Sequence, residues 1–235
     1  MNALVRARQL VRRFGRTTAL DGIDLDIAQG ESVALVGHEG AGRTTLLQIL
    51  AALRPPTSGT VEIAGVDAGR FPFEARLKTL YVGAGLPAVE RLTVRDYLEF
   101  VRRSPRGSAA CWTDATSNIV LDRSALAADA MVDVLSTSMR KRLALAVAIA
   151  AAPRVLLLDD PFALLDADAR SRVPGWLMEA HATGTTIVTA VNDAADAAAL
   201  CDPILRMQQG VIVSRETSRA LRRPRVTSFG EAGVA

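Results

Sequence analysis

Runs of apolar residues along the chain predict a set of β-strands. Residues 23–27 (IDLDI) and 60–65 (TVEIAG) alternate between apolar and polar positions, which is typical of strands with one buried face. Four further runs are apolar almost throughout, as in strands buried on both faces; they are 32–36 (SVALV), 79–83 (TLYVG), 154–160 (RVLLLDD) and 185–191 (TTIVTAV). Helical sequence separates the last two runs, so we expect an α/β core.

Helical periodicity dominates the middle of the chain. Residues 92–103 (LTVRDYLEFVRR) and 126–135 (LAADAMVDVL) are amphipathic, and the polar stretch 105–118 lies between them. We therefore predict a helical insertion over about 92–150. Residues 218–235 mix Arg, Pro and Gly without periodicity and are interpreted as a tail.

Composition narrows the class of protein. With 235 residues and 49% apolar content, the chain can bury a sizeable core in one domain with an inserted lobe. The net charge of +3 comes from scattered Arg and Lys, so a nucleic-acid partner is not expected. The longest apolar run, residues 143–152, is about half of a bilayer span, and any membrane role would require a partner. Cys111 and Cys201 have neither metal-site nor disulfide-framework spacing, which favours a reducing compartment.

A glycine-rich loop carries the first chemical signal. The segment GHEGAGRTT (37–45) follows a predicted strand and precedes a helix, the context that separates a phosphate-binding loop from a chance glycine cluster. Its glycines let successive backbone N–H groups point at phosphates, the helix N-terminus adds partial positive charge, and Thr44 offers a hydroxyl to Mg²⁺. Arg43 stands where such loops carry lysine.

An acidic pair carries the second signal. Residues 155–158 form an apolar strand that runs into Asp159 and Asp160, and this arrangement delivers carboxylates to the carboxyl end of a buried strand. We expect Asp159 to hold Mg²⁺ through water. A turn or helix-capping role remains the simpler alternative for both acids.

Six motifs in order resemble those of the ATP-binding cassette (ABC) proteins over about residues 4–215. They are Phe14 as the adenine-stacking aromatic, 37–45 as the Walker A loop, 135–146 (LSTSMRKRLALA) as the signature segment, 156–161 (LLLDDP) as Walker B, 163–166 (ALLD) as the D-loop and 188–193 (VTAVND) as the switch. The resemblance implies a P-loop NTPase core of the RecA-like type with an N-terminal antiparallel β region. Its expected boundaries are 1–91 and 151–217 for the core and 92–150 for the helical signature subdomain.

The resemblance also implies ligands and partners. In such families two cassettes sandwich two ATP molecules and drive a multi-span membrane permease subunit from the cytoplasmic face of the cell membrane. The residues implied to contact ATP are Phe14, Gly37, Gly40, Gly42, Arg43, Thr44, Thr45 and Ser136. Thr44 and Asp159 would hold Mg²⁺, and Asp160 and Asn192 occupy the catalytic positions.

Five positions depart from the family pattern. Arg43 replaces lysine, Ala84 replaces the Q-loop glutamine, Asp160 replaces glutamate, Asn192 replaces the switch histidine and Ser138 replaces a signature glycine. A guanidinium is bulkier than an ammonium, alanine coordinates nothing, and asparagine carries no proton. We therefore expect weakened ATP binding and very slow hydrolysis.

Simpler structural roles stay open for several of these residues. Ser136 and Asp166 could act only as helix N-caps, and Phe14 could be a core aromatic. His38 and Glu39 occupy variable positions of the loop and are expected to face solvent rather than perform acid–base chemistry.

Three functional hypotheses follow. The chain is a catalytically impaired, nucleotide-binding partner of an intact cassette, or an active ATPase subunit that drives transport as a homodimer or heterodimer. The third, a soluble ABC protein acting on ribosomes or DNA, is the least favoured because such chains usually carry two cassettes or specific insertions. Cargo and direction of transport do not follow from the sequence.

Overall fold

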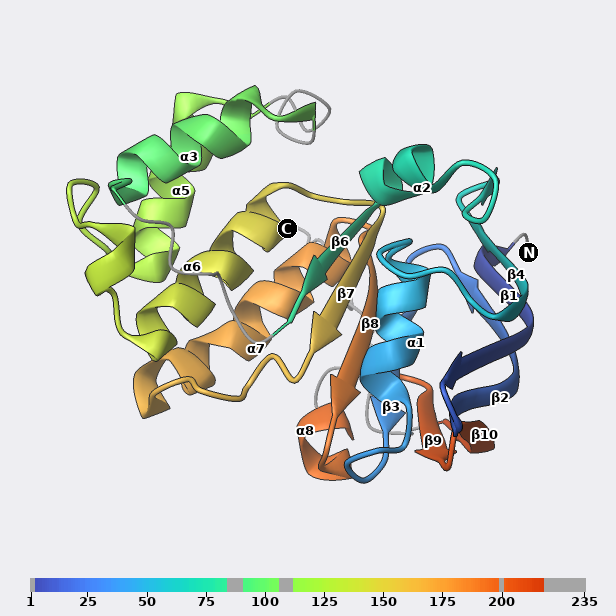
Figure 1. The fold of residues 1–235 in the computed structure, drawn as a ribbon. Helices are drawn as coiled ribbons and strands as arrows, with labels where there is room; N and C mark the ends of the chain where they lie inside the picture. Colours follow the sequence, from blue (N-terminus) through green and yellow to red (C-terminus); the bar gives the residue numbers. More distant parts are fainter. Residues whose placement is uncertain (1–2, 84–90, 106–111, 199–200, 218–235) are drawn as a thin grey trace, which may run out of the picture.

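A mixed six-stranded sheet forms the centre of the protein (Figure 1). The computed structural model describes residues 3–83, 91–105, 112–198 and 201–217. The strand order is β10-β9-β3-β8-β7-β6, in which only the edge pair β9–β10 is antiparallel. The strands are β3 (Ser32–Val36), β6 (Thr79–Val82), β7 (Val155–Asp159), β8 (Thr186–Val191), β9 (Ile204–Gln208) and β10 (Val211–Glu216). Every residue of β3 and β8 is buried, as expected for parallel strands covered on both faces.

A four-stranded antiparallel sheet lies beside the central one. Its order is β2-β1-β4-β5, with bounds Thr17–Ala28, Ala3–Phe14, Ser58–Ile63 and Val66–Asp67. Helix α1 (Arg43–Leu50) lies between the two sheets and buries four apolar side chains there (Figure 1). The same core cluster takes Val155 and Leu157 from β7, so α1 is held against the central sheet by packing on one of its faces.

The opposite face of the central sheet is covered by α6 (Thr137–Ala150) and α7 (Ala167–Ala182) (Figure 1). Leu156 and Leu158 alternate with the residues that face α1 and join a second core cluster with these helices. The short helix α8 (Ala194–Ala198) joins the same cluster through Ala197, whereas α2 (Pro72–Lys78) packs through Ala75 into the cluster of α1.

A helical group stands apart from the sheets. Helices α3 (Val94–Arg103) and α5 (Asp114–Ser124) pack with α6 around a third cluster that includes Leu98, Val120 and Leu143 (Figure 1). Helix α6 therefore belongs to two clusters, one shared with the central sheet and one with the helical group.

The predicted helix at 126–135 is wrong. Only a 3₁₀ turn forms there, at Val132–Val134. The backbone instead pairs with the start of α3: the Val132 N–H donates to Leu92 at 2.9 Å, and Val94 donates to Ala130 at 2.8 Å. Tertiary pairing of the backbone has overridden the amphipathic pattern.

The polar stretch expected at 105–118 contains the start of a helix. Helix α5 begins at Asp114 because Thr113 caps it, and the Thr113 hydroxyl accepts from the Thr116 N–H at 3.2 Å in a reciprocal capping box. The polar residues at 113–118 therefore belong to the N-terminus and the exposed face of α5 rather than to a connecting loop.

Other expectations agree with the structure. The α/β class with an antiparallel sheet in the N-terminal region is confirmed, and the six predicted strands are present with ends shifted by a few residues. Ala84, Cys111 and the tail 218–235 lie outside the described residues. Within the part of the chain that the structure covers, no helix is both long and apolar enough to span a bilayer.

Gly59 supplies a test of this packing. Its φ is +89°, and an added Cβ would lie 2.3 Å from the Gln9 carbonyl oxygen, so Gly59→Ala must shift β1 against β4. We expect a loss of about 2 kcal/mol in the free energy of unfolding. Gly175→Ala is the matched control, because nothing lies within 4 Å of its added Cβ inside α7, and it should gain about 0.5–1 kcal/mol. Urea denaturation followed by circular dichroism measures both, and equal effects would contradict the packing described for Gly59.

Candidate functional site

The glycine loop forms a backbone cradle between β3 and α1. A Cβ at Gly37 would lie 2.4 Å from the Met207 carbonyl oxygen, and one at Gly42 would lie 2.4 Å from that of Ala19. Gly40 has a φ of +79° and open space around it. No side chain caps the N-terminus of α1, so its first amides are not used by a capping residue. His38 and Glu39 are exposed, as predicted.

Asp159 and Asp160 lie at the carboxyl end of β7, beside β6 and β8. The Asp160 N–H donates to Ala190 on β8 at 2.9 Å, and Asp160 has a φ of +46°, a left-handed conformation that aspartate tolerates better than most residues. The Tyr81 hydroxyl donates to the Asp159 carboxylate at 2.9 Å. Burial, together with the neighbouring Asp159 charge, raises the pKa of Tyr81 to about 12, so this hydroxyl stays a donor at neutral pH.

Three of the residues expected to depart from the family pattern contact one another. The Arg43 guanidinium donates to the Val191 carbonyl at the end of β8 and, at 2.6 Å, to the side-chain oxygen of Asn192. The Asn192 amide nitrogen then donates to the Asp160 carboxylate at 3.2 Å. Burial lowers the pKa of Arg43 from its usual value, while Asp159 and Asp160 act in the opposite direction, and the group remains a cation. Arg43, Asn192 and Asp160 thus form one hydrogen-bonded chain.

The residues around the loop are suited to a Mg²⁺–nucleotide. Glycine amides and an uncapped helix N-terminus suit phosphate groups. No cluster of three or more His, Cys, Asp or Glu that could hold a metal is found in the described ranges. A metal held by Thr44 and Asp159 would therefore take its remaining oxygen ligands from water and from a bound molecule, which is how Mg²⁺ binds with phosphates.

Phe14 is 40% exposed, so the core-aromatic alternative is wrong. It ends β1, and the guanidinium carbons of Arg12 and Arg54 lie 4.6 and 5.1 Å from its ring centroid. The ring is available to a planar ligand only where these cations leave part of a face free.

The signature segment starts α6. Ser136 caps this helix by accepting from the Met139 N–H at 3.2 Å, which confirms the predicted cap. Ser138 and Asp166 form two reciprocal hydrogen bonds: the Ser138 hydroxyl donates to the carboxylate at 2.6 Å and accepts from the Asp166 N–H at 3.0 Å. Asp166 also caps α7, as predicted, through the Ala169 N–H at 2.9 Å. The signature and D-loop segments of one chain are therefore joined.

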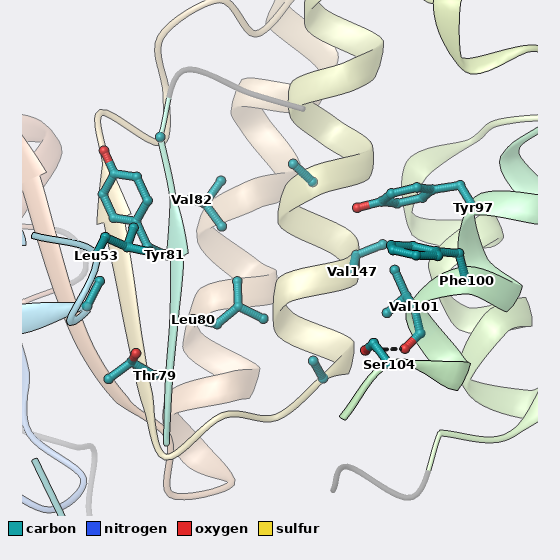
Figure 2. A pocket seen from close by; sticks show the side chains of 14 residues that line it. Leu53, Thr79, Leu80, Tyr81, Val82, Tyr97, Phe100, Val101, Ser104 and Val147 are labelled. Carbon is teal, nitrogen blue, oxygen red and sulfur yellow. Dashed lines mark hydrogen bonds between the residues drawn. The ribbon is translucent and has the colours of Figure 1, made fainter. Parts of the chain in front are cut away.

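A groove of about 360 Å³ lies between β6 and the helical group (Figure 2). In Figure 2, Tyr97, Phe100 and Val101 of α3 face Val147 of α6, and Leu80 lies across the groove on β6. Phe100 is 66% exposed, which is unusual for a side chain of its size, and the groove also reaches Gly83 at the end of β6.

Two residues at the site were not predicted from the sequence. The sequence pattern places Tyr81 only in the apolar strand 79–83. A tyrosine hydroxyl close to the end of a buried strand is the signal that could have indicated a hydrogen bond to a neighbouring polar side chain. Lys141 lies on α6 with no exposed surface, and its ammonium donates to the carbonyls of Gly83 and Asp159. It lies between Arg140 and Arg142 at the start of α6, so nothing in the sequence distinguished it from an exposed basic residue.

Sequence comparison identifies a protein family and several related proteins. A family model described as "ABC transporter" matches residues 20–163. The sulfate/thiosulfate import ATP-binding protein CysA of Salmonella typhi is 34% identical over 231 residues, which cover 96% of this chain and 63% of that protein. The CysA of Xylella fastidiosa is 37% identical over 215 residues, covering 88% and 61%. The chain thus spans less than two thirds of the length of these relatives.

Solved structures share the fold. An ATP-binding subunit of an ABC transporter superposes with a TM-score of 0.81 at 22% identity, covering 91% of this chain and 90% of that one. A dimeric ATP-binding cassette bound to ADP and Pi gives 0.79 at 24% identity, covering 92% and 99%. At such identities the likeness concerns the fold, which is that of a P-loop ATP-binding cassette. Together with the matched family model and the CysA relatives, this means that the chain belongs to the ABC transporter family.

Proposed function

We propose that this chain is the nucleotide-binding subunit of an ABC transporter and that its own catalytic site is impaired. It binds ATP with Mg²⁺, hydrolyses it slowly, and works with a second cassette and a multi-span membrane permease subunit at the cytoplasmic face of the membrane. The observation that carries the proposal is the hydrogen-bonded chain Arg43–Asn192–Asp160.

ATP binding is supported by what remains intact. The glycine cradle, the uncapped start of α1, the exposed Thr44 hydroxyl and the Asp159 carboxylate provide groups for phosphate and for one metal ion. Phe14 offers a partly exposed ring for the base. The matched CysA proteins are named as ATP-binding proteins.

Slow hydrolysis follows from how the three substituted side chains are occupied. Arg43 must give up its bonds to Val191 and Asn192 before its donors can reach a phosphate. Asp160 is one methylene shorter than glutamate, and it already accepts from Asn192, so its carboxylate is poorly placed to polarise an attacking water. Asn192 can donate to a phosphate but cannot carry a positive charge.

The active ATPase alternative has one observation in its favour. Asp160 still ends β7 beside Asp159, so a carboxylate is present at the catalytic position and could be reoriented when a nucleotide displaces Asn192.

Arg43 should limit nucleotide affinity. We expect the native chain to bind Mg-ATP saturably with a Kd on the order of 0.1–1 mM, and Arg43→Lys to tighten binding about ten-fold, because a compact ammonium is not held by both Val191 and Asn192. Titration with a fluorescent ATP analogue measures this, and Arg95→Lys on exposed α3 is the matched control. Absence of saturable binding at millimolar nucleotide would reject the retained pocket.

In a complex with an intact cassette, Ser136 should matter more than Asp160. In the sandwich arrangement the signature of this chain completes the partner's working site, so Ser136→Ala should lower the ATPase rate of the complex about ten-fold, while Asp160→Ala should change it less than about three-fold. Ser136→Thr, which keeps both the hydroxyl and the α6 cap, should stay close to native. A large loss from Asp160→Ala with Ser136→Ala near native would establish the active alternative, as would turnover of about one per second or faster by the isolated chain.

A permease subunit should dock at the groove between β6 and α3. The groove exposes Phe100 and reaches Gly83, directly before the Q-loop position, which makes it suited to one short helix of the permease. We expect Phe100→Asp to reduce recovery of the permease in affinity purification from membranes at least about five-fold, because a carboxylate would be buried against apolar walls. Met178→Asp is the control, because the Met178 side chain is exposed on α7, away from the groove. Recovery with ribosomes or nucleic acid instead would favour the soluble alternative.

A further inference from the structure

Lys141 is a buried cation on the signature helix. It has no exposed surface, and it stands in α6 between Arg140 and Arg142, directly before the apolar part of the helix that starts at Leu143. Taking an ammonium out of water costs free energy unless it is hydrogen-bonded or paired. Among the residues that the structure describes, no carboxylate lies within ion-pair distance of it, so backbone groups carry its hydrogen bonds.

Two backbone carbonyls accept those hydrogen bonds. The Lys141 ammonium donates to Gly83 and, at 3.4 Å, to Asp159. These two residues sit at matching places, because β6 and β7 pair in parallel register with Val82 opposite Leu158 as the last pair. Lys141 therefore bridges the two strands one residue beyond the point where their own ladder ends.

The charge of Lys141 also interacts with the carboxylates of Asp159 and Asp160. Burial lowers the pKa of Lys141, and Asp160 and Asp159 oppose that shift by stabilising the cation. Arg43 interacts with the same two acids. Arg43 therefore interacts with the two acids from α1, and the Lys141 ammonium interacts with them from α6.

We propose that Lys141 is a positioning residue for the nucleotide site. By fixing the Asp159 backbone while Tyr81 holds its carboxylate, it sets where the metal-binding oxygen points. By holding Gly83, it ties the end of β6 to the helix that begins at the Ser136 cap. A movement of the signature helix is thereby transmitted to the metal side of the site. This inference rests on the proposed function.

Amide hydrogen exchange of the full chain without nucleotide provides the first test. Lys141→Met keeps the length and apolar packing of the side chain but removes its donors, so peptides covering 79–83 and 155–159 should exchange about ten-fold faster. Lys141→Gln keeps two N–H donors and should stay within about two-fold of native. Lys141→Leu repeats the comparison with different packing in case the Met variant does not fold.

Leu143→Ala on the same helix is the matched control. It removes a fully buried side chain from the cluster of the helical group, so its faster exchange should spread over α3, α5 and α6 rather than concentrate at the ends of β6 and β7. This separates positioning from a general loss of stability.

Nucleotide titration is the second readout. Lys141→Met should weaken binding of Mg-ATP about ten-fold and leave binding of ATP in excess chelator within about two-fold, because only the metal depends on where Asp159 points. Unchanged exchange at the two strand ends in both Lys141→Met and Lys141→Leu would overturn the inference, and so would equal damage by Lys141→Gln. If the native chain binds no nucleotide, the proposed function fails, whereas the exchange result still decides whether Lys141 holds the strand ends.

Discussion

The parallel strands β3, β7 and β8 are buried on both faces, and this constraint places the glycine loop, the acidic pair and Asn192. Their carboxyl ends meet at one edge of the sheet. Gly37 follows β3, Asp159 ends β7, and Asn192 follows β8, so Arg43 and Asn192, which are 149 positions apart, become hydrogen-bonded neighbours. Helix α1 packs on the face of the sheet next to the antiparallel sheet and presents its N-terminus at the same edge. Ligands of open α/β sheets bind at such an edge for this reason.

Arg43, Asn192 and Asp160 form one hydrogen-bonded unit at this edge. A guanidinium has five donors in a fixed plane and needs acceptors on more than one side. The Asn192 side chain supplies an acceptor to Arg43 and, through its amide nitrogen, a donor to Asp160, and a protonated histidine could not serve both roles. The free-energy contributions of side chains that are hydrogen-bonded to one another are not additive. Replacing one of Arg43, Asn192 and Asp160 therefore changes the hydrogen bonds of the other two.

Helix α6 packs against the helical group, and three polar side chains at its start make hydrogen bonds on the side of the site. Ser136 caps its start, Ser138 is bonded to Asp166 at the start of α7, and Lys141 reaches the ends of β6 and β7. The helix also contributes to two core clusters, so it cannot shift against the sheet without disturbing both. This makes α6 the mechanical connection between the groove at Phe100 and the acidic pair.

Local patterns in the sequence were sufficient for the α/β class, six of the ten described strands, the glycine loop between a strand and a helix, and the helix caps at Ser136 and Asp166, because each depends on neighbouring residues or on a period of two or 3.6. Strands β1, β5, β9 and β10 were not predicted. Local patterns were also not sufficient for residues 126–135, whose backbone pairs with the start of α3, or for Lys141, whose partners lie on two distant strands. They also did not reveal that Arg43, Asn192 and Asp160 bond to one another. Those features depend on which chain segments meet in space, and hydrogen bonds between distant residues leave no periodic trace in a single sequence.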